Sequence, residues 1–158
     1  MKILVTGGAG YIGSFMTKCL LERGDEVVVA DILERGHEEV IDSRAKFYQG
    51  NLLDKNFVES LFRENKFDGV IHFAGFISMG ESMENPYIYF QNNVFSALNL
   101  MEEMVKTGTN NFIFSSSAGV YGNPVKVPIP EDHPTNPENP YGESKLMVEK
   151  LMKWYQKT

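Results

Sequence analysis

The chain has 158 residues and a formal net charge of −6, and 42% of its residues are hydrophobic. This length suits one domain with a substantial core, and the hydrophobic content argues against disorder. The negative charge argues against a nucleic-acid or acidic-membrane partner, and no apolar run approaches the roughly 20 residues of a membrane span.

Helix and strand patterns alternate along the chain. The predicted strands are 2–6, 26–30, 46–49, 68–73 and 111–116, and the predicted helices are 11–23, 55–65, 86–107 and 141–157. Alternation with almost wholly apolar strands predicts an α/β fold, a Rossmann-type doubly wound parallel sheet in three αβα layers. Six prolines between 123 and 140 exclude a helix there and predict an extended rim loop or lid.

The turn after the first strand predicts a dinucleotide site. Gly8, Gly10 and Gly13 fit G-x-G-x-x-G, and Gly7, Gly10 and Gly13 fit G-x-x-G-x-x-G. Glycines there permit a tight turn, close approach of a pyrophosphate and close packing of the helix, whose first N–H groups then face the anion. An ordinary glycine-rich turn is the alternative.

Cys19 lies in the first predicted helix and is the only cysteine, so no disulfide can form within the chain. This pattern fits a reducing cytoplasm, and we expect Cys19 to be a small core residue. Lys2 is followed by only three apolar residues, which predicts a strand and not a signal peptide at the N-terminus.

Asp31, at the end of the second predicted strand, favours the dinucleotide interpretation. It lies 18 residues beyond Gly13, close to the roughly 20 expected for the acid that binds the adenosine ribose. A carboxylate there accepts hydrogen bonds from ribose hydroxyls and repels a 2′-phosphate, so NAD is predicted over NADP. A turn residue at a strand end is the alternative.

The helix predicted at 86–107 begins with favourable residues, since Asn85 can cap it and Pro86 suits a first turn. One apolar stripe runs along it: Tyr87, Phe90, Val94, Leu98, Met101 and Val105, widened by Phe95 and Met104. Such a face predicts core packing, or contact with a partner subunit on one side.

Tyr141 and Lys145 share one face at the start of the last predicted helix. A phenol with a pKa near 10 is a poor base at neutral pH, but a neighbouring ammonium group lowers that pKa. A run of serines, 115–117, comes after the fifth strand, where doubly wound folds bind ligands. Tyr-x-x-x-Lys alone would indicate a surface pair, and the glycine turn favours the catalytic interpretation.

Together these motifs resemble the extended short-chain dehydrogenase/reductases, and most of all the members that epimerise UDP-glucose and UDP-galactose at C4. The resemblance covers the whole chain and rests on residues 6–13, 72–75, 80–82, 92–94, 115–122 and the pair at 141 and 145. It implies an NAD-dependent isomerase of galactose and carbohydrate metabolism that is cytoplasmic and homodimeric. It also implies a nucleotide-sugar substrate, with no metal, nucleic-acid or membrane partner.

The resemblance assigns a role to each matched position. The implied cofactor-binding residues are Gly7, Gly10, Tyr11, Ile12, Gly13, Asp31, Asn51, Leu52, Phe73, Ala74, Gly75, Asn92, Tyr141 and Lys145. Ser117, Tyr141 and Lys145 match the catalytic serine, tyrosine and lysine. In the family the tyrosine takes the sugar 4-hydroxyl proton while hydride passes to NAD, and the keto sugar turns and regains the hydride on its other face.

The chain departs from the family in three ways. Asn51 stands where aspartate is usual, Ile77 stands where the epimerases usually have lysine, and the chain has roughly half of the usual length. The length predicts a single NAD-binding domain, 1–158, with the C-terminal substrate domain absent. We therefore expect NAD binding but poor epimerisation by these residues alone.

Two other functions stay open. Nucleotide-sugar 4,6-dehydratases and decarboxylases carry acidic residues where Ala118 and Gly119 stand, which ranks them below an epimerase. A non-catalytic NAD-binding module is favoured by the short length. For the dimer, the resemblance implies a four-helix bundle of 86–107 and 141–157 from each subunit, with Met101, Met104, Leu151 and Trp154 offering apolar surface.

Overall fold

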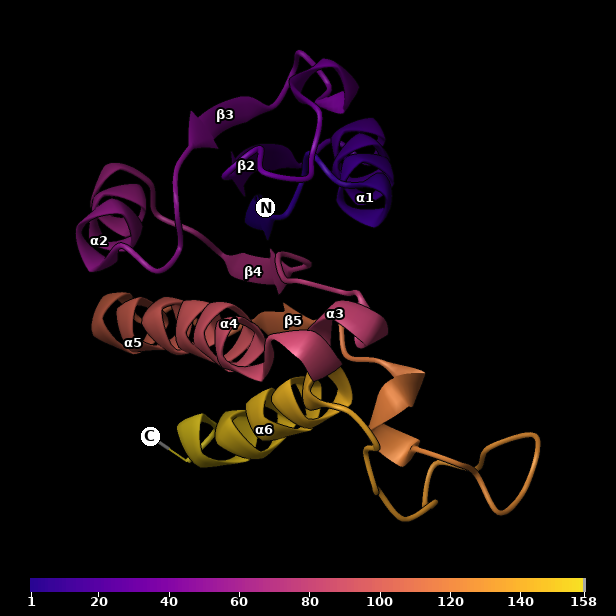
Figure 1. Cartoon of the computed structure of the whole chain (residues 1–158). Coiled ribbons are helices and arrows are strands. Elements are labelled where there is room, and N and C mark those ends of the chain that lie inside the picture. Colours follow the sequence, from indigo (N-terminus) through magenta and orange to yellow (C-terminus); the bar gives the residue numbers. More distant parts are fainter. Residues whose placement is uncertain (158) are drawn as a thin grey trace. The chain divides into compact units, whose positions relative to one another are not determined.

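The computed structural model describes residues 1–157 and contains one five-stranded parallel sheet (Figure 1). Its strands are β1 (Lys2–Thr6), β2 (Glu26–Asp31), β3 (Lys46–Gln49), β4 (Gly69–His72) and β5 (Phe112–Phe114). They lie in the order β3-β2-β1-β4-β5, so the winding reverses between β1 and β4. This order confirms the predicted doubly wound, Rossmann-type sheet.

The bounds of the predicted helices agree with the structure within about two residues, but one predicted helix is divided and the short helices η1, α3 and η3 were not predicted. The helices are α1 (Tyr11–Glu22), η1 (Glu38–Val40), α2 (Lys55–Glu64), α3 (Met79–Glu84), α4 (Pro86–Phe90), η2 (Gln91–Phe95), α5 (Ser96–Thr107), η3 (Ala118–Tyr121) and α6 (Pro140–Tyr155). The helix predicted at 86–107 is α4, the π-helical turn η2 and α5 in succession. The short helix α3 was not predicted, although Ser78 caps it by accepting a hydrogen bond from the Glu81 N–H.

The chain forms two compact units. The first is Met1–Ala74 with Asn99–Ser115, and it contains the whole sheet, α1, α2 and most of α5. The second is Gly75–Leu98 with the chain from Ser116 onward, and it contains α3, α4, η2, η3 and α6.

Alternating strand residues of the first unit supply two separate apolar cores. Leu4 and Val70 pack with Leu61 of α2 and Leu100 of α5. Their sequence neighbours point the other way, as Ile3 and Val5 do in the cluster that contains Leu20 of α1. Figure 1 shows α1 and α2 on opposite sides of the strands. A sheet with an apolar core on each face gives the predicted αβα layers.

Cys19 corrects one prediction, because its side chain is exposed and not in the core. The buried residues of α1 are Gly13, Thr17 and Leu20. They recur at the helical spacing of three to four residues, which leaves Cys19 on the solvent side of the helix.

The apolar stripe predicted for 86–107 is also partly wrong. Val94, Met101 and Met104 are buried, but Tyr87, Phe95 and Val105 are 71%, 55% and 50% exposed. The fully buried positions include Tyr89, Ala97 and Leu100. The π-helical turn η2 explains the difference, because a turn closed from i to i+5 holds one extra residue and rotates the next helical turns relative to α4.

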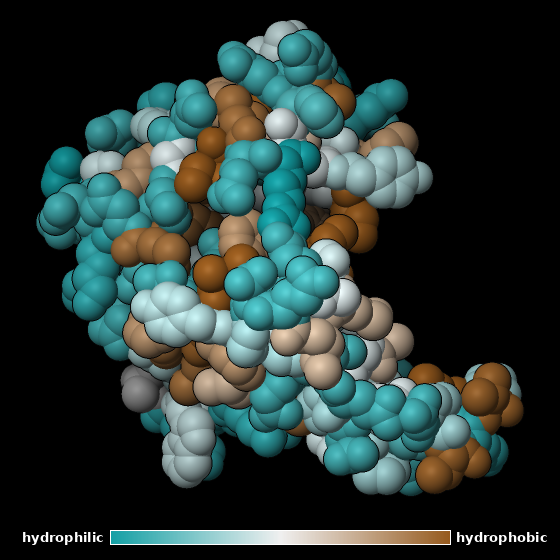
Figure 2. All heavy atoms as spheres, viewed as in Figure 1, coloured by the Kyte–Doolittle hydropathy of each residue, from teal (hydrophilic) through white to brown (hydrophobic). Residues whose placement is uncertain are grey.

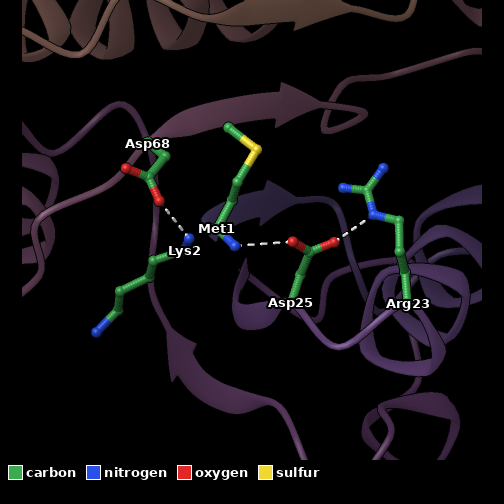
Figure 3. A network of polar contacts seen from close by, with 5 residues as sticks. All are labelled: Met1, Lys2, Arg23, Asp25 and Asp68. Carbon is green, nitrogen blue, oxygen red and sulfur yellow. Dashed lines mark hydrogen bonds and ion pairs between the residues drawn. The ribbon is translucent and has the colours of Figure 1, made fainter.

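A polar network joins the start of β1 to two turns of the first unit (Figure 3). The Met1 ammonium group lies 2.9 Å from Asp25 Oδ1, and Arg23 Nε donates to Asp25 Oδ2 at 2.5 Å. The Lys2 N–H donates to Asp68 Oδ2 at 2.6 Å. Hydrogen bonds from the ammonium group and then from Arg23 lower the pKa of Asp25.

Candidate cofactor and catalytic site

The glycine turn forms a tight cradle between β1 and α1. Gly7 has a φ of 72°, and a Cβ there would lie 2.6 Å from the Ala74 backbone nitrogen. A Cβ on Gly13 would overlap the Gly7 carbonyl oxygen. Only glycine fits at these two positions, so the start of α1 packs directly on the turn.

The start of α1 is open to an anion. Gly10 is its N-cap, no side chain caps it, and no acidic residue lies in its first turn. Tyr11 and Ile12 come next, and they are 82% and 58% exposed. Uncapped N–H groups at the positive end of a helix are the arrangement that binds phosphate groups, so the turn fits a pyrophosphate.

Asp31 fastens the loop after β2 to the glycine turn. Its Oδ2 accepts a hydrogen bond from the Ala9 N–H at 3.0 Å, and its Oδ1 accepts one from the Leu33 N–H at 2.9 Å. The Ala9 carbonyl accepts in turn from the His37 N–H at 3.0 Å. Asp31 is therefore a turn residue, as the alternative interpretation expected, and it also stands beside the predicted pyrophosphate turn.

The other predicted cofactor residues of the first unit lie after β3 and β4. Asn51 is exposed, and its Oδ1 accepts from the Leu53 N–H at 2.9 Å. The Leu52 side chain is buried in the core. Phe73 continues the pairing of β4 with β1 through its N–H and the Thr6 carbonyl, at 3.0 Å.

In the second unit, the serine loop packs against the start of α6. Ser117 caps η3 by accepting a hydrogen bond from the Gly119 N–H at 3.0 Å. A Cβ on Gly119 would lie 3.2 Å from Ser117 Oγ and 3.9 Å from Tyr141 Cε1. A Cβ on Gly142 would lie 2.6 Å from the Gly119 carbonyl oxygen. Ser117 and Tyr141 therefore both border Gly119.

Tyr141 and Lys145 form a buried pair on α6. They are 8% and 3% exposed, and Lys145 Nζ lies 6.0 Å from the Tyr141 ring centroid. Burial disfavours the charged ammonium group and lowers the pKa of Lys145 to about 8. This burial rules out the surface-pair interpretation of the Tyr-x-x-x-Lys spacing.

Asn93 lies in the motif at 92–94 but received no role of its own from the sequence, and it organises the neighbouring backbone. Its Oδ1 accepts from the Phe76 N–H at 2.8 Å, and its Nδ2 donates to the Phe76 carbonyl at 3.0 Å and to Ser144 Oγ at 3.0 Å. Asn92 Nδ2 donates to Asn93 Oδ1 at 3.2 Å. A signal was available, since two adjacent amides in an apolar helix must find partners when they are buried.

Gly75 lies beside Asn93 and Lys145. A Cβ there would be 3.0 Å from Asn93 Oδ1 and 3.6 Å from Lys145 Nζ. The second unit therefore brings together five of the predicted residues: Gly75, Asn92, Ser117, Tyr141 and Lys145.

Within residues 1–157, no group of three or more His, Cys, Asp or Glu side chains is placed to hold a metal ion. The same residues include no helix long and apolar enough to cross a membrane.

The parallel sheet with a reversal between β1 and β4, and the glycine cradle at the β1–α1 turn, define a Rossmann-type protein of the nucleotide-binding class. The family model described as GDP-mannose 4,6 dehydratase matches residues 4–158. The chain belongs to this family.

Known relatives carry a different enzyme name from the family model. The UDP-glucose 4-epimerase of Streptococcus mutans is 51% identical over 156 residues, which are 98% of this chain and 47% of the relative. A crystal structure of a UDP-glucose 4-epimerase superposes with a TM-score of 0.97 at 46% identity, over 99% of this chain and 48% of the other.

The UDP-glucose 4-epimerase of Bifidobacterium longum, solved in complex with NAD⁺ and UDP, has a TM-score of 0.92 at 40% identity, over 97% of this chain and 48% of the other. These relatives confirm the resemblance predicted from the sequence. The chain spans about half of their length.

Proposed function

We propose that this chain is the NAD-binding part of a nucleotide-sugar 4-epimerase of the UDP-glucose/UDP-galactose type. The observation that carries the proposal is the buried pair of Tyr141 and Lys145, with Ser117 bordering the same glycine as the tyrosine. The glycine cradle and the open start of α1 support NAD, and so does the relative solved with NAD⁺ and UDP.

Each candidate residue has a task in this proposal. The first N–H groups of α1 hold the pyrophosphate, and Asp31 accepts hydrogen bonds from the adenosine ribose while it keeps the glycine turn in place. Tyr141 takes the proton of the sugar 4-hydroxyl, and Ser117 hydrogen-bonds the same oxygen. Lys145 orients the cofactor ribose and favours the tyrosinate by its charge. NAD, when bound, supplies the hydride acceptor.

A 4,6-dehydratase is the second candidate, because the matching family model carries that description. Residues 115–122 include no carboxylate, and Ala118 and Gly119 occupy the place where the resembled dehydratases have acids. One carboxylate does reach this loop, since Ser116 Oγ donates to Glu149 of α6. That hydrogen bond engages the carboxylate, so we rank the epimerase first and a non-catalytic NAD-binding module third.

The proposal includes a cytoplasmic homodimer. Met101 and Met104, which the sequence analysis offered as dimer surface, are 3% and 5% exposed, so they belong to the core of the chain itself. Leu151 is half-buried, and Trp154 is 67% exposed, so both keep their place in the proposed interface. Tyr87 and Phe95 of the second unit, which are also exposed, join them.

Calorimetry with NAD and NADP tests the cofactor assignment. We expect the chain to bind NAD more tightly than NADP. Asp31→Ala should weaken NAD about 10- to 100-fold, since a hydrogen bond to a charged group contributes roughly 1.5–3 kcal/mol. Asp132→Ala, an exposed carboxylate on the proline-rich loop, is the matched control and should not change the affinity. Tighter binding of NADP than of NAD would overturn the assignment.

A coupled assay for UDP-glucose formed from UDP-galactose tests the reaction. Because the chain spans about half of its relatives, we expect turnover by these 158 residues far below the ~10 s⁻¹ typical of enzymes. Fixing the sugar can contribute several kcal/mol of barrier reduction, and that contribution is expected to be missing.

In a full-length form, Tyr141→Phe should remove most turnover and leave NAD bound. Full activity of that variant would refute the role of Tyr141.

A further inference from the structure

Among residues 1–157, Tyr89 of α4 is the largest side chain that is fully buried, at 0% exposed. Its ring meets the Tyr141 ring edge to face, with 6.5 Å between centroids and 85° between planes. On another side it contacts the Phe76 ring at 5.7 Å and 60°. Tyr89 thus connects Tyr141 to the segment that Asn93 clamps.

The Tyr89 hydroxyl group is anchored by an acid from a different helix. It donates to Glu81 Oε2 at 2.6 Å. Glu81 belongs to α3, whose start is fixed by Ser78 Oγ, the acceptor of the Glu81 N–H at 3.3 Å. A short hydrogen bond to a carboxylate is among the stronger kinds, so it fixes the tilt of the Tyr89 ring as well as its depth.

We infer that Tyr89, held by Glu81, is a positioning residue that fixes the ring of Tyr141 over Lys145. Tyr141 neighbours both residues, since its ring meets the Tyr89 ring edge to face and its centroid lies 6.0 Å from Lys145 Nζ. Edge-to-face packing is directional, so Tyr89 restricts the orientation of Tyr141 and not only its distance. The catalytic meaning of this inference rests on the proposed function, but the positioning itself does not.

The titration of Lys145 reports on this positioning without cofactor or sugar. Burial lowers the pKa of Lys145 to about 8, and a displaced Tyr141 ring would let water reach the ammonium group. The pKa would then rise toward its ordinary value of about 10.4. Substitution of a residue that only contributes to global stability would not change the pKa of Lys145 in the folded protein.

The experiment measures the Lys145 side chain by NMR in the chain labelled with ¹³C-lysine, assigned by comparison with Lys145→Arg. Tyr89→Leu removes the ring contact and should raise the pKa of Lys145 by about one unit or more, a tenfold change in proton affinity. Glu81→Leu removes the anchor and should raise it in the same direction. Glu81→Gln keeps an oxygen acceptor for the tyrosine hydroxyl and should restore a value near that of the unaltered chain.

Two controls separate positioning from general loosening. Tyr87→Leu alters the same helix at a side chain that is 71% exposed, and should leave the Lys145 titration unchanged. Val148→Ala opens the fully buried part of α6 and should lower the stability without moving the titration. If Tyr89→Leu does not fold, the test rests on Glu81→Leu and Tyr89→Phe. Both remove the hydrogen bond between Glu81 and the Tyr89 hydroxyl group, and both should raise the pKa of Lys145.

An unchanged Lys145 titration in the folded Tyr89 and Glu81 variants would overturn the inference, and so would an equal rise in Val148→Ala. If the titration moves as expected while calorimetry detects no NAD binding, the positioning stands and the proposed function fails.

Discussion

Because of Lys145, the stability of the chain should depend on pH in the alkaline range. Burial lowers the pKa of its ammonium group to about 8 in the folded state, against about 10.4 in an unfolded chain. Between these values the unfolded state binds more protons, so the free energy of unfolding rises as the pH rises. Each unit of pKa difference corresponds to about 1.4 kcal/mol, so the rise from about pH 8 to about pH 10 is at most about 3 kcal/mol.

Urea denaturation at several pH values between about 7 and about 10 measures this dependence. Lys145→Met should remove most of the rise, because its side chain carries no proton to lose. Lys153→Met changes an exposed lysine on the same helix and should keep the slope of the unaltered chain. A slope that is equal in all three proteins would show that Lys145 is not buried as a neutral amine.

At the scale of single residues, the sequence predicts the features that backbone geometry demands. Gly7 and Gly13 are predicted from spacing alone, and the structure shows that a Cβ at either would collide with backbone atoms. The role of Asn93 and the importance of Tyr89 were not predicted, because both depend on partners from other helices, Ser144 and Glu81, that no local pattern indicates.

At the scale of elements, two identical helix starts differ in their caps. Asn85-Pro86 opens α4 and Asn139-Pro140 opens α6. The Asn139 side chain accepts a hydrogen bond from the Gly142 N–H at 2.8 Å, whereas Asn85 makes no cap hydrogen bond. The sequence predicts a cap only at Asn85, and that prediction is wrong because the Asn85 side chain makes no cap hydrogen bond. The cap at Asn139 was not predicted, although the same Asn-Pro pair stands there.

We therefore expect Asn139→Ala to lower the free energy of unfolding by about 1 kcal/mol, the usual contribution of such a cap. Asn85→Ala should change it by only a few tenths, since no cap hydrogen bond is lost. Chemical denaturation of both variants at one pH makes the comparison. Equal losses from the two substitutions would mean that the cap hydrogen bond at Asn139 contributes nothing.

The elements also show where periodicity stops being informative. The strands predicted at 2–6 and 46–49 have the same bounds in the structure, because short β-branched or aromatic runs between turns have few alternatives. The π-helical turn at Gln91–Phe95 has no such signature. Extending one helical period through it placed Tyr87 in the core and overlooked Tyr89.

At the scale of the whole molecule, the candidate residues are divided between the two compact units. The glycine cradle and Asp31 belong to the unit with the sheet, whereas Ser117, Tyr141 and Lys145 belong to the other. In each unit, hydrogen bonds within that unit hold the candidate residues in place: the Ala9–Asp31 hydrogen bond in the first and the Asn93 network in the second.

Figure 2 shows hydrophobic side chains on the proline-rich loop of the second unit, where Val125 and Val127 are 86% and 79% exposed.

The exposed apolar residues of the helices predict self-association. Tyr87, Phe95 and Trp154 are each more than half exposed, and covering a large apolar side chain contributes roughly 1.5–3 kcal/mol. If they form the proposed homodimer, light scattering at high micromolar concentration gives twice the mass of the chain.

Trp154→Glu places a charge in that interface and should weaken the dimer at least about tenfold, because unpaired buried charges are strongly unfavourable. Val125→Glu adds the same charge on the proline-rich loop and should leave the mass at twice that of the chain. A monomer mass for the unaltered chain, or the same dimer for Trp154→Glu, would contradict the proposed interface.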